Sequence, residues 1–107
     1  MPHVVYLLEC SDGSYYTGSA ADLSQRLWQH EQGAVPSSYT YRRRPVKFVW
    51  TSEECKNYSP ALRWERQIKG WTRAKKEALI RGDFDALHEI VKSERKRKEE
   101  IKRNPLR

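Results

Sequence analysis

Residues 4–19 read VVYLLECSDGSYYTGS. On both sides of Ser11-Asp12-Gly13 this stretch is rich in the β-branched, aromatic and aliphatic residues that are common in strands. The three central residues are of the kinds that form turns. The stretch therefore predicts a β-hairpin at the start of the chain.

The length of the turn decides whether two tyrosines of this hairpin can act together. A two-residue loop would point Tyr6 and Tyr16 to opposite faces of the sheet. A three-residue loop with a left-handed Gly13 would instead pair Cys10 with Ser14 and put both tyrosines on one face. We favour the three-residue loop because Gly13 stands where a positive φ is required.

The rest of the chain predicts one more strand and several helices. In chain order these are a helix over 22–32, a strand over 46–51, and helices over 60–70, over 72–81 and from 83 onward. Asp22 and Gly33 are suited to begin and end the first helix, and Ser59 is expected to cap the second ahead of Pro60. We therefore expect a small α/β fold in which helices flank a three-stranded sheet.

The length of 107 residues fits one small domain, because dividing it would leave two poor cores. We expect this domain to cover residues 1–91. Beyond Ser93 only Ile101 and Leu106 are apolar, so we expect residues 92–107 to form a frayed or disordered tail.

The formal net charge of +7 suggests a polyanionic partner. Residues 92–107 hold eight Lys or Arg against three Glu, which leaves a net charge of +2 for residues 1–91. Most of the charge therefore belongs to the tail, and the total alone says little about the folded body.

The sequence contains no stretch near the roughly 18 apolar residues that a membrane span requires, and its amino terminus does not resemble a secretory signal. We therefore expect a cytoplasmic protein with no membrane partner. Cys10 and Cys55 stand alone, without the spacing of a zinc site. In a reducing compartment we expect both to be buried free thiols.

Two clusters of basic residues in the body of the chain have the composition that phosphate contacts require. The members that we predict to contact nucleic acid are Arg42, Arg43, Arg44, Lys47, Arg63 and Lys69. A solvated basic face is the ordinary alternative for both clusters.

Helical spacing places Arg26 and His30 side by side on the apolar face of the helix over 22–32. The planar guanidinium of Arg26 suits a phosphate, and His30 can exchange a proton near neutral pH. A pair that faces solvent while its stems cover the edge of the core is the alternative interpretation.

Glu65 lies at or near the apolar stripe of the helix over 60–70. The apolar members of that stripe are Ala61, Leu62, Trp64 and Ile68. Burying a carboxylate without a partner costs several kcal/mol, roughly, so Glu65 requires a cation or a donor. A lone carboxylate suits Mg²⁺, which keeps several waters and also binds substrate phosphate. The alternative is a salt bridge to Arg63, Arg66 or Lys69.

Taken in order, these residues resemble the GIY-YIG nuclease domain. The resemblance covers roughly Pro2 to Ile80. It includes two tyrosine motifs ten residues apart, an Arg ten residues after the second Tyr, a His four residues later, and a Glu on the following long helix. The first strand, Tyr-Leu-Leu-Glu-Cys, is similar to that of the short stand-alone bacterial members of the family, many of which are uncharacterised.

The resemblance implies a divalent-metal-dependent endonuclease that nicks nucleic acid, in the first place DNA, in repair or recombination. It implies that Glu65 binds one Mg²⁺ or Mn²⁺ ion and that Arg26 steadies the scissile phosphate. It also implies that Tyr6, with Tyr16 beside it, accepts a proton from the attacking water. A phenol has a pKa near 10, which Arg26 and the metal would lower, and His30 is the alternative acceptor.

Three departures from the family pattern keep other functions open: Val4-Val5 replaces Gly-Ile, Ser19 stands where some members carry Lys, and no Asn occurs between Glu65 and Asn104. One alternative is a module that binds nucleic acid without cleaving it. Another is a protein-interaction domain that uses the last helix. A protein partner that supplies specificity is also compatible with the sequence, which leaves the oligomeric state open.

Overall fold

The computed structural model describes residues 2–103, and it describes side chains for residues 2–97. The chain divides into two compact units, Met1–Trp71 and Thr72–Arg107. The sequence instead predicts a single domain over 1–91, and the number of domains stays a prediction. We describe each unit by itself.

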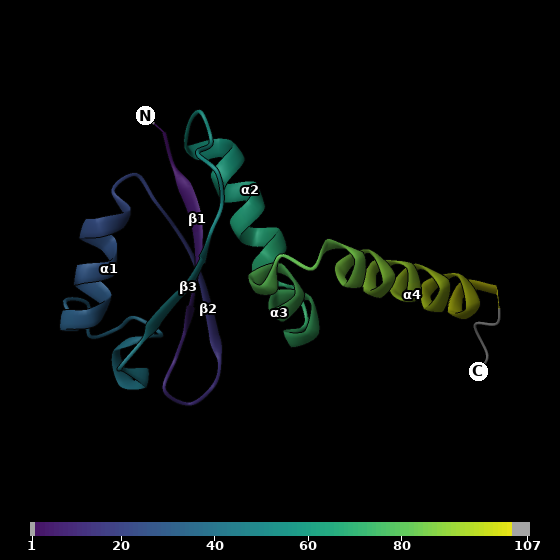
Figure 1. Cartoon of the computed structure of the whole chain (residues 1–107), viewed down its shortest axis with the longest axis horizontal. Coiled ribbons are helices and arrows are strands. Elements are labelled where there is room, and N and C mark those ends of the chain that lie inside the picture. Colours follow the sequence, from purple (N-terminus) through teal and green to yellow (C-terminus); the bar gives the residue numbers. More distant parts are fainter. Residues whose placement is uncertain (1, 104–107) are drawn as a thin grey trace. The chain divides into compact units, whose positions relative to one another are not determined.

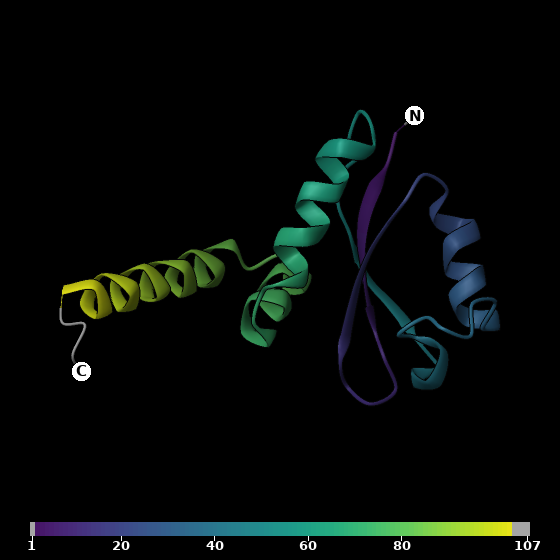
Figure 2. The same cartoon turned by 180° about the vertical axis from the view of Figure 1, so that it is seen from behind.

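The first unit is built on an antiparallel sheet of β1 (Val4–Glu9), β2 (Tyr15–Ala20) and β3 (Lys47–Thr51), in the order β2-β1-β3. Helix α1 (Leu23–Gln32) covers one side of this sheet and helix α2 (Tyr58–Lys69) covers the other (Figure 1). Figure 2 shows the same arrangement from behind. The predicted α/β fold with a three-stranded sheet is confirmed.

The hairpin has the predicted three-residue turn. Gly13 has a φ of +83°, and the backbone N–H of Cys10 donates to the carbonyl of Ser14 at 2.8 Å. In the resulting register Leu8 pairs with Tyr16 and Tyr6 pairs with Gly18. Because side chains alternate along a strand, Tyr6 and Tyr16 share one face of the sheet.

The predicted N-cap residue is confirmed for α1 and wrong for α2. Asp22 accepts a hydrogen bond from the backbone of Gln25 at 3.0 Å, as its capping role requires. The predicted cap of α2, Ser59, is wrong, because Asn57 is the N-cap and accepts from the Ser59 backbone at 3.2 Å. Asn caps a helix at least as well as Ser, so the helix begins two residues earlier and Pro60 falls within its first turn, where no backbone donor is needed.

The core of the first unit lies on both faces of the sheet. Toward α1, the buried Tyr6, Leu8 and Ala20 pack against partly buried residues of α1 and β2. The opposite face of β1, with Val5 and Leu7, is also fully buried. Cys10 is buried, Cys55 is half-buried, and both are free thiols.

Trp64 does not belong to the apolar stripe of α2, which the sequence analysis predicted. Its side chain is 51% exposed, whereas Ala61 and Ile68 are buried. At 100° per residue, Trp64 lies about 60° to one side of Ala61 and Glu65 about 40° to the other, so the two stand at opposite edges of the buried row, and only the Glu65 edge is half-buried. The prediction was correct for Glu65, which is half-buried, and wrong for Trp64.

The second unit contains α3 (Arg73–Arg81) and α4 (Phe84–Arg103). Thr72 caps α3, and Asp83 accepts from the backbone of Ala86 at 3.0 Å at the start of α4. Helix α4 continues to Arg103, whereas the sequence predicts fraying beyond Ser93. The continuation is rich in Glu, Lys and Arg, which favour helix without any apolar contact. Residues 104–107 of the predicted tail lie outside the described residues.

Within residues 2–103, no helix combines the length and the apolar character that crossing a membrane requires.

Candidate active site

Gly18 allows the ring of Tyr6 to lie against β2. A Cβ atom at this position would stand 2.5 Å from the Tyr6 hydroxyl oxygen and 2.6 Å from its Cζ. It would also stand 2.9 Å from Cε2 of Tyr16. Distances this short are not tolerated in packed proteins. The glycine of the Tyr16-Thr17-Gly18 motif therefore provides the space in which the two tyrosine rings meet.

His30 connects Tyr6 to a loop on the far side of the imidazole. Its Nε2 lies 2.8 Å from the hydroxyl oxygen of Tyr6, and its Nδ1 lies 2.7 Å from Oγ1 of Thr40. Oγ1 of Thr40 is in turn 3.1 Å from Oγ of Ser38. Tyr6, His30 and Thr40 are all buried, so this is a buried chain of polar groups that ends at Ser38.

Tyr16 lies among three other rings. Its centroid is 6.3 Å from that of Tyr6, 5.1 Å from that of His30 and 6.1 Å from that of Tyr39. The Tyr39 ring is nearly parallel to it, at 23°. Aromatic pairs at such distances attract one another beyond their buried area, so Tyr39 and His30 hold the Tyr16 ring from two sides.

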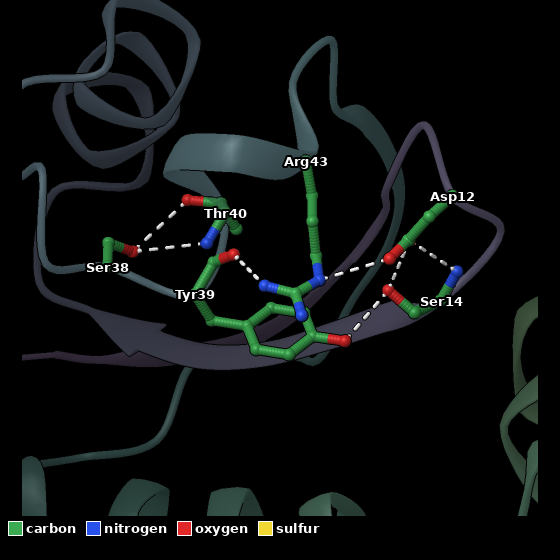
Figure 3. A network of polar contacts seen from close by, with 6 residues as sticks. All are labelled: Asp12, Ser14, Ser38, Tyr39, Thr40 and Arg43. Carbon is green, nitrogen blue, oxygen red and sulfur yellow. Dashed lines mark hydrogen bonds and ion pairs between the residues drawn. The ribbon is translucent and has the colours of Figure 1, made fainter.

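Tyr39 is held by contacts to the hairpin turn (Figure 3). The guanidinium of Arg43 lies 3.8 Å above its ring, and Nη1 of Arg43 donates to its carbonyl at 2.8 Å. Nε of Arg43 forms an ion pair with Asp12 at 3.0 Å. The Tyr39 hydroxyl donates to Oγ of Ser14 at 2.9 Å, and Ser14 donates to Asp12. The loop after α1 is thus tied to the turn between β1 and β2.

Arg26 is exposed and lines a pocket of about 360 Å³ together with Tyr16 and His30. The remaining lining residues are Gln29, Gly33, Val35, Ser38, Thr40 and Tyr41. A guanidinium at the edge of a pocket is well suited to receive a phosphate in a bidentate manner. Tyr6 is fully buried and does not line this pocket.

Glu65 approaches the same strand from α2. The hydroxyl of Ser19 donates to its Oε2 at 3.5 Å, which is a long contact. Among the side chains described for residues 2–97, no cation forms an ion pair with Glu65, so the salt bridge that the sequence left open is absent from this part. Glu65 does not line the 360 Å³ pocket either.

The charges of Arg26 and Glu65 both reach the tyrosine pair. Burial raises the pKa of Tyr6 far above its ordinary value; Tyr16 and Glu65 add to this rise in pKa, and Arg26 opposes it. Burial raises the pKa of Tyr16 most, Glu65 raises it further, and Arg26 lowers it. Arg26 therefore lowers the pKa of both phenols, as expected, but burial outweighs it, so Arg26 alone does not turn either phenol into a phenolate.

His30 is shifted in the direction that keeps it neutral. Burial, and then the positive charge of Arg26, lower the pKa of His30 below its ordinary value. A neutral imidazole has one donor and one acceptor nitrogen. The site thus holds a neutral phenol and a neutral imidazole in contact, beside a cation.

The donor set around Glu65 fits a hydrated Mg²⁺ or Mn²⁺ ion. Within residues 2–103, no group of three or more His, Cys, Asp or Glu side chains gathers, so this part of the chain has no closed metal cage. Mg²⁺ is often held by one or two carboxylates together with waters and substrate phosphate. A half-buried carboxylate that contacts a hydroxyl, and that forms no ion pair with the side chains of residues 2–97, matches that requirement.

The predicted nucleic-acid contacts fall into two groups. Arg43 and Arg44 are engaged within the protein, Arg43 as described above and Arg44 through its Nε, which donates to the carbonyl of Tyr41 at 2.9 Å. The four others are exposed: Arg42, Lys47, Arg63 and Lys69. Arg63 lines a shallow hollow with the exposed Trp64.

Sequence reasoning missed Tyr39 and Thr40, which lie between the predicted helix over 22–32 and the predicted strand over 46–51. Neither residue follows a helical or strand period, so no pattern singled them out. The one available signal was an aromatic and a hydroxyl residue placed next to Arg42, Arg43 and Arg44, in a loop that follows the helix carrying His30.

Comparison with known proteins identifies relatives of this chain. Residues 2–78 match the model of a family described as the GIY-YIG catalytic domain. The UPF0213 proteins of Staphylococcus aureus strains Mu3 and Mu50 are each 46% identical over 79 residues, which cover 74% of this chain and 94% of theirs. A UPF0213 protein of Bacillus halodurans, solved by NMR, is 41% identical over 75% of this chain and 83% of its own, with a TM-score of 0.47.

Proposed function

The chain belongs to the family of GIY-YIG catalytic domains, and we propose that it is a divalent-metal-dependent endonuclease that hydrolyses phosphodiester bonds in DNA. The observation that carries this proposal is the environment of Glu65. This carboxylate lacks an ion pair within residues 2–97, and its charge acts on both Tyr6 and Tyr16. A cation-binding group therefore stands beside groups that can exchange protons.

Arg26 is the proposed phosphate-binding residue. Its side chain is exposed at the pocket edge and is close enough to Tyr6 to affect the pKa of the phenol. A bidentate guanidinium would orient the scissile phosphate and offset negative charge that builds up on its oxygens.

Tyr6 and His30 together are the proposed base. Tyr6 alone is a poor base, because burial raises the pKa of its hydroxyl and so keeps the phenol protonated near neutral pH. The Nε2 atom of His30 lies 2.8 Å away, so the phenol can pass its own proton to the imidazole while it accepts one from water. The base therefore remains shared between the two residues, now as a hydrogen-bonded pair.

Glu65 is the residue that would hold the metal ion. When bound, a divalent ion at such a site would neutralise charge on the phosphate and favour ionisation of a water molecule. The carboxylate is half-buried on α2 and faces the hydroxyl of Ser19 on β2.

The decisive experiment pairs two glutamate variants. The full chain is incubated with nicked, branched and single-stranded DNA in Mg²⁺ or Mn²⁺. We expect Glu65→Gln to lower cleavage at least about a hundredfold. Glu53→Gln, which removes the same charge from an exposed residue of the loop after β3, should leave cleavage unchanged. Equal cleavage by wild type and Glu65→Gln would refute the metal-site proposal.

The second candidate is a module that binds nucleic acid without cleaving it. The exposed Trp64 beside Arg63 favours it, because an indole face and a guanidinium are the groups on which bases stack. Salt-dependent DNA binding without metal-dependent cleavage would support this candidate. Loss of that binding in Trp64→Ala, with unchanged folding, would locate it on α2.

A further inference from the structure

Thr40 is a buried hydroxyl residue with a defined partner. Its side chain is 1% exposed, and its Oγ1 lies 2.7 Å from Nδ1 of His30, on the opposite side of the imidazole from Tyr6. Figure 3 shows Thr40 and Ser38 in contact in the loop after α1. Such a contact can decide which ring nitrogen of the histidine carries the proton.

The acceptors available to Tyr6 determine which group donates and which accepts in the hydrogen bonds from Tyr6 to Thr40. Tyr6 is a neutral phenol and therefore has one proton to donate, and Arg26 beside it can only donate. Among the side chains described for residues 2–97, the acceptors near that hydroxyl are Nε2 of His30 and the phenol oxygen of Tyr16. An imidazole nitrogen is a much stronger base than a phenol oxygen, so the proton of Tyr6 goes to Nε2.

The direction of the hydrogen bond between His30 and Thr40 then follows. With Nε2 as acceptor, the neutral imidazole carries its proton on Nδ1 and donates it to Oγ1 of Thr40. Oγ1 of Thr40 also shares a hydrogen bond of 3.1 Å with Oγ of Ser38, in which either oxygen can be the donor. Each buried polar group in this arrangement has a partner of the correct kind.

We propose that Thr40 is a positioning residue of this site, and that its hydroxyl oxygen fixes His30 in the tautomer whose Nε2 accepts the proton of Tyr6. The tautomer follows from these hydrogen bonds together with the greater basicity of the imidazole, and it does not depend on any catalytic activity. Its catalytic consequence rests on the proposed nuclease function.

In that reaction the protons balance as follows. The water oxygen bonds to phosphorus while its proton moves to the oxygen of Tyr6, and the proton of Tyr6 moves to Nε2 of His30. The bond from phosphorus to the leaving oxygen breaks, and that oxygen takes a proton from solvent. The imidazolium keeps the proton on Nδ1, which remains hydrogen-bonded to Thr40. It returns the proton on Nε2 to solvent through Tyr6.

The tautomer can be measured without any activity. In NMR spectra of the full chain labelled with ¹⁵N at histidine, the His30 signals are identified by their loss in His30→Gln. We expect a protonated Nδ1 and an unprotonated Nε2 in the wild type near pH 7.5. A protonated Nε2 would overturn the proposal, whether or not the protein cleaves DNA.

Three variants test the role of the hydroxyl. Thr40→Val removes the acceptor at nearly constant volume, so we expect it to reduce the Nδ1-protonated form and to lower kcat about ten- to a hundredfold with little change in KM. Thr40→Ser should restore both. Thr17→Val is the matched control, because Thr17 is equally buried and its hydroxyl has no hydrogen-bond partner among the described residues.

The outcomes separate the two proposals. If Thr40→Val keeps both the wild-type tautomer and the wild-type kcat, Thr40 does not position His30. If the wild type shows the expected tautomer but cleaves no DNA under any metal, the nuclease proposal fails and the hydrogen-bond assignment stands. Should Thr40→Val not fold, the tautomer of the wild type and of Thr40→Ser still decides the assignment.

Discussion

The hydroxyl oxygen of Tyr6 lies 2.8 Å from Nε2 of His30, although 24 residues separate them in the sequence. One residue comes from the central strand of the sheet and the other from the last turn of α1. Their contact joins an acid of raised pKa to a base of lowered pKa. The proposed proton acceptor is therefore a pair of side chains, and each member can be tested by one substitution.

Removing the hydroxyl of Tyr6 should impair both stability and cleavage. Tyr6→Phe keeps the ring over Gly18 but leaves Nε2 of His30 without its buried partner, which costs about 1–3 kcal/mol in the free energy of unfolding. The kcat for DNA cleavage should fall at least about a hundredfold. Tyr58→Phe, on a ring that is 50% exposed, should change neither quantity in urea unfolding and cleavage assays. Wild-type cleavage by Tyr6→Phe would leave His30 as the sole base.

Adding a methyl group at Gly18 should disrupt the tyrosine pair. In Gly18→Ala the new Cβ would meet the Tyr6 hydroxyl at 2.5 Å, so the ring must move, at a cost of about 1–3 kcal/mol in the free energy of unfolding. Gly70→Ala is the control, because its Cβ would come no closer than 3.7 Å to Gln67 and its φ is −81°. That variant should be neutral or more stable by up to about 1 kcal/mol. Equal urea midpoints for the two variants would contradict the close approach.

The stability of the protein should decrease as the pH falls below neutrality, in part through His30. Its pKa in the folded chain is below the ordinary value of 6.5, so the unfolded chain binds more protons once the pH drops below that value. The contribution of neutral His30 is fully present above about pH 6.5 and is lost as the pH falls through the folded pKa. Urea unfolding at about pH 7.5 and about pH 5.5 measures the decrease, which should be smaller in His30→Gln. An identical decrease in that variant would assign it to other groups.

Two arginines that sequence reasoning treated alike should differ in DNA binding. Arg63 is exposed on α2, whereas the fork of Arg43 is occupied by Asp12 and by the carbonyl of Tyr39. If Arg63 contacts a phosphate, Arg63→Gln should lower the slope of log affinity against log salt concentration by about one. Arg43→Gln should leave that slope unchanged. Binding titrations at several salt concentrations, without divalent ions, distinguish the two, and the reverse pattern would contradict the assignment.

Arg43→Gln should instead disturb the packing of the Tyr39 ring against Tyr16. The ion pair with Asp12 is exposed to solvent and therefore contributes little to stability. The guanidinium over the Tyr39 ring adds about as much. The main expected effect is therefore a lower kcat through a less ordered Tyr16, measured at saturating DNA. Arg42→Gln, on an exposed neighbour, is the control.

The parts of the fold that sequence predicted well are those that local chemistry determines. Gly13 required a positive φ, and that single requirement set the length of the turn, the register of the hairpin and the shared face of Tyr6 and Tyr16. Asp22 and Gly33 marked the limits of α1 for the same reason. Each of these features depends on residues a few positions apart.

The parts that sequence did not predict depend on contacts between distant segments. Thr40 is ten residues from His30, and only the folded path of the loop brings them together. Asn57 and Ser59 are both good caps, so the choice between them depends on where α2 begins against the sheet. The partner of Glu65 likewise could not be chosen in advance, because its contact is the hydroxyl of Ser19, which lies 46 residues earlier in the sequence.

The contacts of Asp12 make the hairpin turn a poor place for engineering. Short surface turns usually accept an inserted tag or a longer loop. Here the same carboxylate binds Ser14 within the turn and Arg43 across from it, and those contacts continue to Tyr39 and Tyr16. A spectroscopic label or epitope placed at this turn would therefore report on a disturbed site, however well the rest of the protein folded.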